Sequence, residues 1–141
     1  MKISIISIPV RNQERSIRFF LDILGFRLVV DRPIPGSQNR WVQLAPPTGE
    51  VSICLVTWYT SMSPGSQRGF IFETRHLDED AIMLKERGLL FEPIQEAPWA
   101  RFITFSDPDG NSFILQEVKR DDRISKRLTR YLPGQGSSVS E

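Results

Sequence analysis

The chain has 141 residues and a mass of 16.2 kDa, the size of one compact domain or of one domain built from two small halves. Hydrophobic residues make up 40% of it and charged residues 25%, and no apolar run reaches the ~20 residues that a membrane-spanning helix requires. A formal net charge of +1 argues against a nucleic-acid-binding core. The composition therefore excludes a membrane protein and disfavours a nucleic-acid partner.

The chain opens with an apolar run at residues 3–10, which is followed by no small-residue cleavage site. We interpret this run as a first strand rather than a signal peptide, and we expect a cytoplasmic protein. A helix is predicted next, from Asn12 as its N-cap to Gly25, which suits the left-handed position after a helix. Three further strands are predicted at residues 26–30, 41–44 and 51–56, with a turn at residues 46–49.

The second half of the chain repeats this order. A strand is predicted at residues 69–74, followed by a helix from Asp78 as its N-cap to Gly88, 63 residues after Gly25. Further strands are predicted at residues 89–94, 101–105 and 112–118, with a hairpin turn at residues 107–111. Each half is thus a β-α-β-β-β unit. We predict a first unit at residues 1–58, a linker at 59–68, a second unit at 69–118 and a C-terminal segment at 119–141.

The C-terminal segment is basic and amphipathic. Residues 119–130 carry six Lys and Arg side chains against Asp121 and Asp122. Apolar residues follow at the spacing of one helix face, at Ile124, Leu128, Tyr131 and Leu132. We predict a short helix that ends at Pro133-Gly134, with a disordered tail beyond it. This helix packs on the domain or on a dimer partner, or it serves as an arm for anionic ligands.

Several short motifs occur in a distinctive order along the chain. They are Ser16-Ile17-Arg18-Phe19-Phe20, Leu24-Gly25-Phe26, Arg40-Trp41-Val42, Ala45-Pro46-Pro47, Leu84-Lys85-Glu86-Arg87-Gly88, Pro98-Trp99 and Asp107-Pro108-Asp109-Gly110-Asn111. In this order they resemble the vicinal oxygen chelate superfamily, which includes glyoxalase I, bleomycin-resistance proteins and extradiol dioxygenases. The resemblance covers about residues 3–118. It implies an α+β fold in which two βαβββ units pair into a cup-shaped mixed sheet that holds a small molecule.

In metal-using members of that superfamily, His, Gln or Glu side chains from the first and last strands of the two units hold a divalent ion. Matching the motifs places these positions at Ile5, Gly69 and Ile114, and at Ser52 or Ile53. Such an ion needs nitrogen or carboxylate donors, which these side chains do not offer. The resemblance therefore implies a cup without a metal ion, and we expect no cofactor.

Alternation along the strands separates two faces of each predicted sheet. The faces expected under the helices are uniformly apolar and include Ile6, Ile8, Val10, Phe70, Phe72, Phe113 and Leu115. The faces expected to line the cup are mixed and include Ile5, Ser7, Ser52, Cys54, Val56, Gly69, Ile71, Glu73, Ile114 and Gln116. A largely apolar wall with a few polar groups is typical of a small-molecule site. Glu73 and Gln116 either point into the cup or lie at its exposed rim.

Aromatic and polar side chains near this cup are the candidates for ligand binding. Trp99 is the first choice for stacking on a flat ligand and Trp41 the second, although both also suit core or interface packing. Glu73 and Arg101 are able to fix polar groups of a ligand or to pair with each other. The predicted ligand-binding set is completed by Gln116 and Ser52.

Other reactive residue types have structural explanations. His76, the only histidine, lies two residues before the predicted helix cap and is interpreted as a solvated loop residue. Cys54 has no histidine in its unit to activate it, so we expect a buried thiol that behaves as a small hydrophobic group. Asp107 and Asp109 belong to the predicted turn, where Asp side chains stabilise the backbone. We therefore assign no catalytic residue and no metal ligand.

Three functions remain compatible with the sequence. The first, which we favour, is a homodimer that binds a small, partly aromatic molecule in a metal-free cup, as drug-sequestering resistance proteins of the superfamily do. The second is a metal-dependent lyase or isomerase of the glyoxalase kind, or a dioxygenase, with ligands at other positions or with acid–base catalysis by Glu73. The third is a non-catalytic module that serves assembly alone. The sequence leaves open the identity of the ligand and whether the units pair within one chain or between chains.

Overall fold

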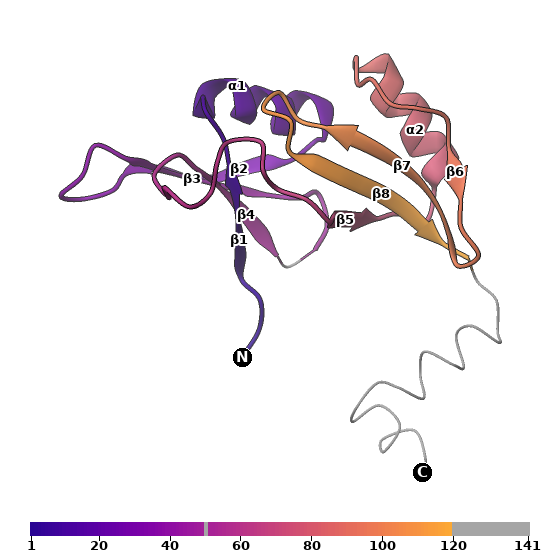
Figure 1. Ribbon diagram of the computed structural model, residues 1–141, viewed down its shortest axis with the longest axis horizontal. Coiled ribbons are helices and arrows are strands. Elements are labelled where there is room, and N and C mark those ends of the chain that lie inside the picture. Colours follow the sequence, from indigo (N-terminus) through magenta and orange to yellow (C-terminus); the bar gives the residue numbers. More distant parts are fainter. Residues whose placement is uncertain (50, 120–141) are drawn as a thin grey trace, which may run out of the picture.

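The computed structural model describes residues 1–49 and 51–119 and contains two four-stranded sheets with helices packed on them (Figure 1). The first half comprises β1 (Ile5–Pro9), α1 (Gln13–Arg18), the π-helix η1 (Phe19–Ile23), β2 (Arg27–Pro33), β3 (Arg40–Ala45) and β4 (Ser52–Val56). The second half comprises β5 (Phe70–Glu73), α2 (Leu77–Glu86), β6 (Gln95–Glu96), β7 (Ala100–Ser106) and β8 (Ser112–Val118). The predicted α+β class with two βαβββ units is confirmed. The predicted C-terminal helix lies outside the described residues.

The two sheets have the same topology. The first sheet has the strand order β1-β4-β3-β2, and the second has the order β5-β8-β7-β6. In each sheet the first strand of the unit is parallel to its last strand, whereas the other neighbours are antiparallel. Among the described residues no strand of one sheet is hydrogen-bonded to a strand of the other, so β1 and β5 are both edge strands. No helix of this part of the chain is long and apolar enough to cross a membrane.

The strand register confirms the predicted division of faces. In the first sheet Ser7 lies opposite Cys54, and in the second sheet Glu73 lies opposite Gln116, as the alternation requires. The residues between them point to the helices. This apolar set is buried or partly buried and includes Ile8, Val10, Ile53, Leu55, Phe70, Phe72, Phe113 and Leu115.

One hydrophobic core joins the two units on the helix side. Phe20 of η1 is fully buried, and its ring centroid lies 5.3 Å from that of Phe26 and 6.0 Å from that of Phe113 in the second unit. The Phe26 ring lies 5.9 Å from that of Phe72 in β5, at 80° to it. Edge-to-face pairs at such distances add stabilisation beyond the area that they bury. The end of the first helical segment is therefore packed on both sheets.

The two helices begin in different ways. Asn12 caps α1 as predicted, because its side-chain oxygen accepts a hydrogen bond from the Arg15 backbone N–H at 3.1 Å. The prediction of Asp78 as the second cap is wrong, because α2 begins at Leu77 and its N-cap is His76. The Leu77 N–H donates at 2.9 Å to the carboxylate of Glu117, 40 residues away in β8. A local sequence pattern does not reveal such a distant partner.

The strand predicted at residues 89–94 is also wrong in its bounds. Only Gln95 and Glu96 pair with β7 and form β6. Pro93 lacks the N–H that a sheet ladder needs, which explains why the pairing begins after it. Leu89 still packs into the core, whereas Leu90 is 89% exposed, so the alternation survives without the hydrogen bonds.

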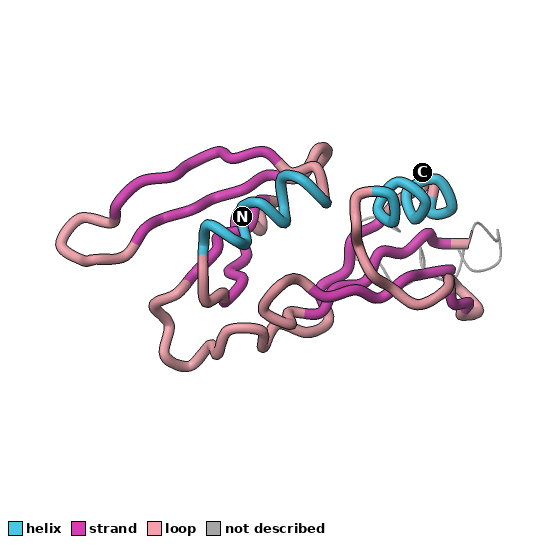
Figure 2. Tube along the Cα trace, turned by 90° about the horizontal axis from the view of Figure 1, so that it is seen from above, coloured by secondary structure: helices cyan, strands magenta, loops and turns pink. Residues whose placement is uncertain are grey.

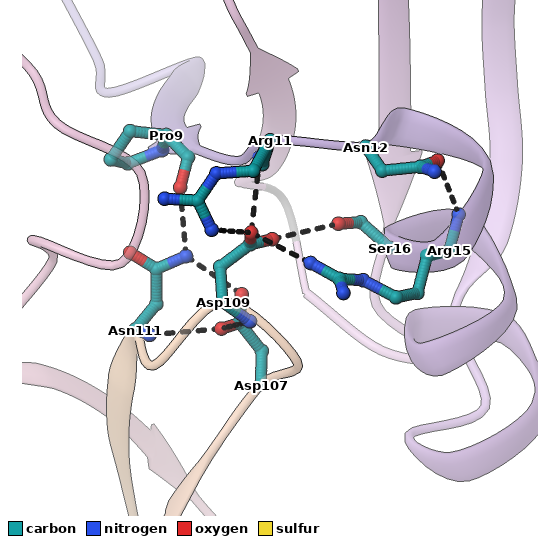
Figure 3. A network of polar contacts seen from close by, with 8 residues as sticks. All are labelled: Pro9, Arg11, Asn12, Arg15, Ser16, Asp107, Asp109 and Asn111. Atoms are coloured by element: carbon teal, nitrogen blue, oxygen red, sulfur yellow. Dashed lines mark hydrogen bonds and ion pairs between the residues drawn. The ribbon is translucent and has the colours of Figure 1, made fainter.

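A polar network joins the hairpin turn of the second unit to the first unit (Figure 3). Asn111 is fully buried, and its Nδ2 donates to the Pro9 carbonyl at the end of β1 at 2.9 Å and to Asp107 at 2.7 Å. The buried carboxylate of Asp109 accepts a hydrogen bond from the Arg15 guanidinium at 2.9 Å. Asp107 also accepts hydrogen bonds from the backbone N–H groups of Asp109 and Asn111, which confirms its predicted turn role. We call this network the inter-unit latch.

Candidate ligand-binding cup

Each sheet leaves one face without a helix, because α1 and α2 both pack on the same side of the molecule (Figure 1). The helix-free face of the first sheet carries Ile5, Ser7, Trp41, Gln43, Ser52 and Cys54. The helix-free face of the second sheet carries Ile71, Glu73, Phe102, Thr104, Ile114 and Gln116. We call these two surfaces the cup faces. They combine apolar groups with hydroxyl, amide and carboxylate groups, which is the composition of a small-molecule site.

Three aromatic rings gather at the first cup face. The ring centroids of Trp41 and Trp58 lie 6.2 Å apart at an interplanar angle of 31°, and those of Trp58 and Tyr59 lie 5.7 Å apart. The Trp41 indole N–H donates to the side-chain oxygen of Gln43 at 3.2 Å, which helps to fix the ring. Tyr59 is 47% exposed, so ring surface remains accessible. We call Trp41, Trp58 and Tyr59 the aromatic corner.

Sequence reasoning chose Trp41 but missed its two aromatic partners. Trp58 and Tyr59 follow β4 directly, so a signal was present in the adjacent aromatic residues at the end of a buried strand. Gln43 was missed as well, although it is two residues from Trp41 on the same strand and so shares its face. Only the hydrogen bond between the two side chains shows that they act together.

The second cup face has a polar row across three strands. Glu73 of β5 lies opposite Gln116 of β8, and Gln116 lies opposite Phe102 of β7. Glu73 is exposed and has no ion-pair partner within residues 1–49 and 51–119. The carboxylate is therefore available to accept hydrogen bonds from a ligand. The next row is apolar apart from a hydroxyl and comprises Ile71, Ile114 and Thr104.

Arg101 does not join this row. Its side chain lies on the helix side, donates to Asp78 of α2 at 2.9 and 3.0 Å and contacts Glu96 at 3.4 Å. The hydrogen bonds from Arg101 lower the pKa of Asp78 below its ordinary value. The pairing of Arg101 with Glu73 that the sequence allowed is not formed, because the alternation along β7 turns Arg101 away from the cup face.

Trp99 lies apart from the aromatic corner within one chain. It precedes β7 in the turn after β6 and is 58% exposed, and its carbonyl accepts a hydrogen bond from the Lys119 N–H at 2.8 Å. Both views show this turn at one end of the molecule and the β2–β3 hairpin, which carries Trp41, at the other (Figure 1 and Figure 2). A single chain therefore does not bring Trp99 and Trp41 together.

The strand register corrects one of the inferred metal positions. The helices of the two units begin 64 residues apart, so Ser7 is the counterpart of Ile71. Ser7 pairs with Cys54 and Ile71 pairs with Ile114, which makes Cys54 the counterpart of Ile114. The register thus moves the fourth position from Ser52 to Cys54, two residues further along the same face.

The four positions do not fit a divalent metal ion. Ile5, Gly69 and Ile114 carry no donor atom in their side chains. Burial raises the pKa of the Cys54 thiol above its ordinary value and so favours the neutral form, whereas a metal binds the thiolate. The part of the chain that the structure describes contains no group of three or more His, Cys, Asp or Glu able to hold a metal.

Two further reactive side chains also stand outside any catalytic arrangement. Cys54 is fully buried, as expected for a thiol that packs as a small hydrophobic group. His76 is exposed at the start of α2, and its backbone N–H donates to the Thr74 hydroxyl at 3.0 Å. Within the described residues no carboxylate holds the His76 ring, so the general-base arrangement of a His–carboxylate pair is not formed there.

Two βαβββ units that share a core and leave one face of each sheet free define the class of paired βαβββ proteins. The chain belongs to the Glyoxalase/Bleomycin resistance protein/Dioxygenase superfamily, whose family model matches residues 2–115. The resemblance noted in the sequence is therefore confirmed.

Similar proteins of known structure come from several bacteria. TnmS3, an antibiotic binding protein from Streptomyces sp. CB03234, is 38% identical, with a TM-score of 0.78 over 84% of this chain and 97% of its own. A superfamily member from Sphaerobacter thermophilus DSM 20745 is 35% identical, with a TM-score of 0.76 over 83% of this chain and 97% of its own. The uncharacterized protein YetH of Bacillus subtilis (strain 168) is 30% identical over 121 residues, which are 82% of this chain and 98% of YetH.

Proposed function

We propose that this protein binds a small, partly aromatic molecule in a cup formed by the two cup faces, without a metal ion at its centre. The aromatic corner is the observation that carries the proposal, because indole rings held by neighbouring rings and by Gln43 offer a rigid stacking surface. The description of TnmS3 as an antibiotic binding protein supports a small-molecule ligand for a chain that is 38% identical to it.

The proposed site combines stacking with a few polar contacts. Trp41 stacks on the ligand, and Trp99 closes on it from the rim. Ser52 and Gln116 exchange hydrogen bonds with its polar groups, and Glu73 accepts from its donors. Arg101 has no place in this proposed set, since Asp78 and Glu96 hold it on the opposite side of the sheet.

We propose a homodimer as the functional form. The first cup face of one copy then closes on the second cup face of the other, which unites Trp41 and Trp99 at one ligand. Ile5 and Ile71 support this arrangement, because they lie on opposite cup faces and are 37% and 51% exposed. Exposed apolar side chains on a sheet face mark a surface that a partner or a ligand covers.

Fluorescence titration of the full chain tests the proposed ligand class. Planar compounds such as acridine and naphthoquinone are titrated against cyclohexanol, which is not planar. Saturable quenching of tryptophan fluorescence by the planar compounds alone supports the proposal, and Trp41→Ala is expected to remove most of that quenching. Absence of saturable quenching by every planar compound contradicts it.

Metal analysis of protein purified without chelator tests the metal-free cup. The proposal predicts zinc, nickel, manganese and iron contents far below one equivalent, and a melting temperature that added EDTA does not change. One equivalent of metal bound through protein side chains would instead favour the lyase, isomerase or dioxygenase chemistry of metal-dependent members of the superfamily.

A further inference from the structure

A cleft of about 510 Å³ opens between the two units on the helix side of the sheets. The first unit contributes Ile6, Ile53 and the loop at residues 46–49, and the second unit contributes Phe72 and Met83 among others. Most of this lining is apolar. The cup faces point away from the helices, so the cleft is distinct from the proposed ligand site. Apolar surface of this kind at the junction of two units needs a cover.

The rim of the cleft is acidic. Glu73 and Asp80 line it, and Glu79 precedes Asp80 in the first turn of α2. Asp80 accepts a hydrogen bond from the Thr74 hydroxyl. Glu73 and Glu79 have no ion-pair partner in the described part of the chain. With Arg75 as the basic side chain of the connecting turn, the rim remains net negative.

The chain leaves the second sheet beside this rim. The Thr74 N–H donates to the Gln116 carbonyl of β8 at 2.9 Å, and Leu77 at the start of α2 is bonded to Glu117 at 2.9 Å. Lys119 is the last described residue, so residues 120–141 begin next to the acidic turn. Eleven residues reach up to about 36 Å when extended and about 16 Å as a helix, so either form of the segment from residue 120 to 130 spans a cleft of this size.

The segment beyond Lys119 complements the cleft in charge and in apolar spacing. Residues 120–130 contain five Lys and Arg side chains against two Asp. The apolar residues on one helical face are Ile124, Leu128, Tyr131 and Leu132. The segment is also an addition to the shared fold. The family match ends at residue 115, and relatives matched over 97–98% of their own length cover only 82–84% of this chain.

We propose that residues 120–132 dock into the inter-unit cleft of the same chain. The apolar side chains of the segment cover the floor of the cleft, and its basic side chains lie along the rim formed by Glu73, Glu79 and Asp80. Docking there ties the second unit to the loop at residues 46–49 of the first unit. The segment thereby restrains the two cup faces relative to each other, from the side opposite to the ligand.

Paramagnetic relaxation in the full chain tests this docking. A nitroxide is attached at Ser125→Cys, a neutral position, and Cys54 does not compete because it is fully buried. The expected result is selective broadening of amide signals at the cleft, for example those of Met83 and Leu84, with little effect on Gln43 at the cup face. Broadening elsewhere, or broadening that is uniform over the surface, overturns the proposal.

Variants identify the forces that hold the segment. Leu128→Asp is expected to lower the ratio of docked to undocked segment about tenfold, as the burial of one leucine side chain implies. Glu79→Lys is expected to lower it about two- to fourfold, whereas Glu92→Lys, the same change outside this rim, leaves it unaltered. Equal effects of the two lysine variants contradict the proposed contact with the rim.

A mixed sample identifies the chain that supplies the segment. Isotope-labelled protein without nitroxide is mixed with unlabelled protein that carries it. Docking in the same chain predicts no cleft broadening in this mixture. Broadening at Met83 in the mixture shows that a second copy supplies the segment and overturns docking within one chain.

Discussion

Asn111→Ala is expected to destabilise the protein by about 3–4 kcal/mol through loss of the inter-unit latch. The Asn111 side chain is fully buried and makes three hydrogen bonds: to the Pro9 carbonyl at 2.9 Å, to Asp107 at 2.7 Å and from the Gln67 N–H at 3.0 Å. Each bond contributes about 1 kcal/mol net, and the partners left behind have no water to replace the amide. The Pro9 carbonyl belongs to the first unit, so the substitution also loosens the junction between units.

Urea denaturation at neutral pH measures this change in the free energy of unfolding. Asn39→Ala is the matched control, because the Asn39 side chain makes no hydrogen bond among the described residues, and it should cost less than about 0.5 kcal/mol. Asn111→Asp keeps the side-chain volume but removes the donor, so it separates hydrogen bonding from packing and should cost at least as much as Asn111→Ala. A loss below about 1 kcal/mol for Asn111→Ala would refute the role assigned to the latch.

Further outcomes follow from the same contacts. Burial raises the pKa of Asp107, against the lowering effect of its hydrogen bonds from Asn111. The folded state therefore holds this proton more tightly than the unfolded state, and the stabilising contribution of Asp107 is largest at low pH and is lost as the pH rises from about 3.8 through the raised folded value. Asp107→Asn should remove this decline from the dependence of the unfolding free energy on pH, measured between about pH 3 and pH 7; an unchanged slope contradicts the assignment. Trp41→Ala and Trp99→Ala should each weaken binding of a planar ligand by about 1–3 kcal/mol in fluorescence titrations, and unchanged affinity in a folded Trp99→Ala variant would reject its stacking role. Ile71→Asp should weaken the dimer at least about tenfold in sedimentation experiments, whereas Ile82→Asp, at an isoleucine that is 61% exposed on α2, should not; equal effects would remove the cup face from the interface.

Most of the fold was predictable because its signals are local. Asn12 caps α1 through a residue three positions away, and Gly25 and Gly88 take the positive φ values that a helix end favours. Strand alternation assigned Ser7 and Glu73 to the cup faces correctly, since side chains of period two need only a strand of known phase.

The candidate site was less predictable, because its members meet through tertiary contacts. Trp41 and Trp58 belong to neighbouring strand ends, and their stacking appears only when the first sheet is assembled. Arg101 could equally have faced the cup or the helix until its pairing with Asp78 was known. A long polar side chain tolerates either face at a sheet margin, so its residue type does not set its direction.

The sequence by itself determined the repeated βαβββ order, the apolar faces beneath the helices and the lack of metal ligands at Ile5, Gly69 and Ile114. These features depend on residue type and on spacings of a few positions. Only the tertiary structure decided that Cys54 rather than Ser52 matches Ile114, and that Asn111 bonds to Pro9, 102 residues earlier in the chain. Such pairings depend on register and on the packing of one unit against the other, which no short window of the sequence contains.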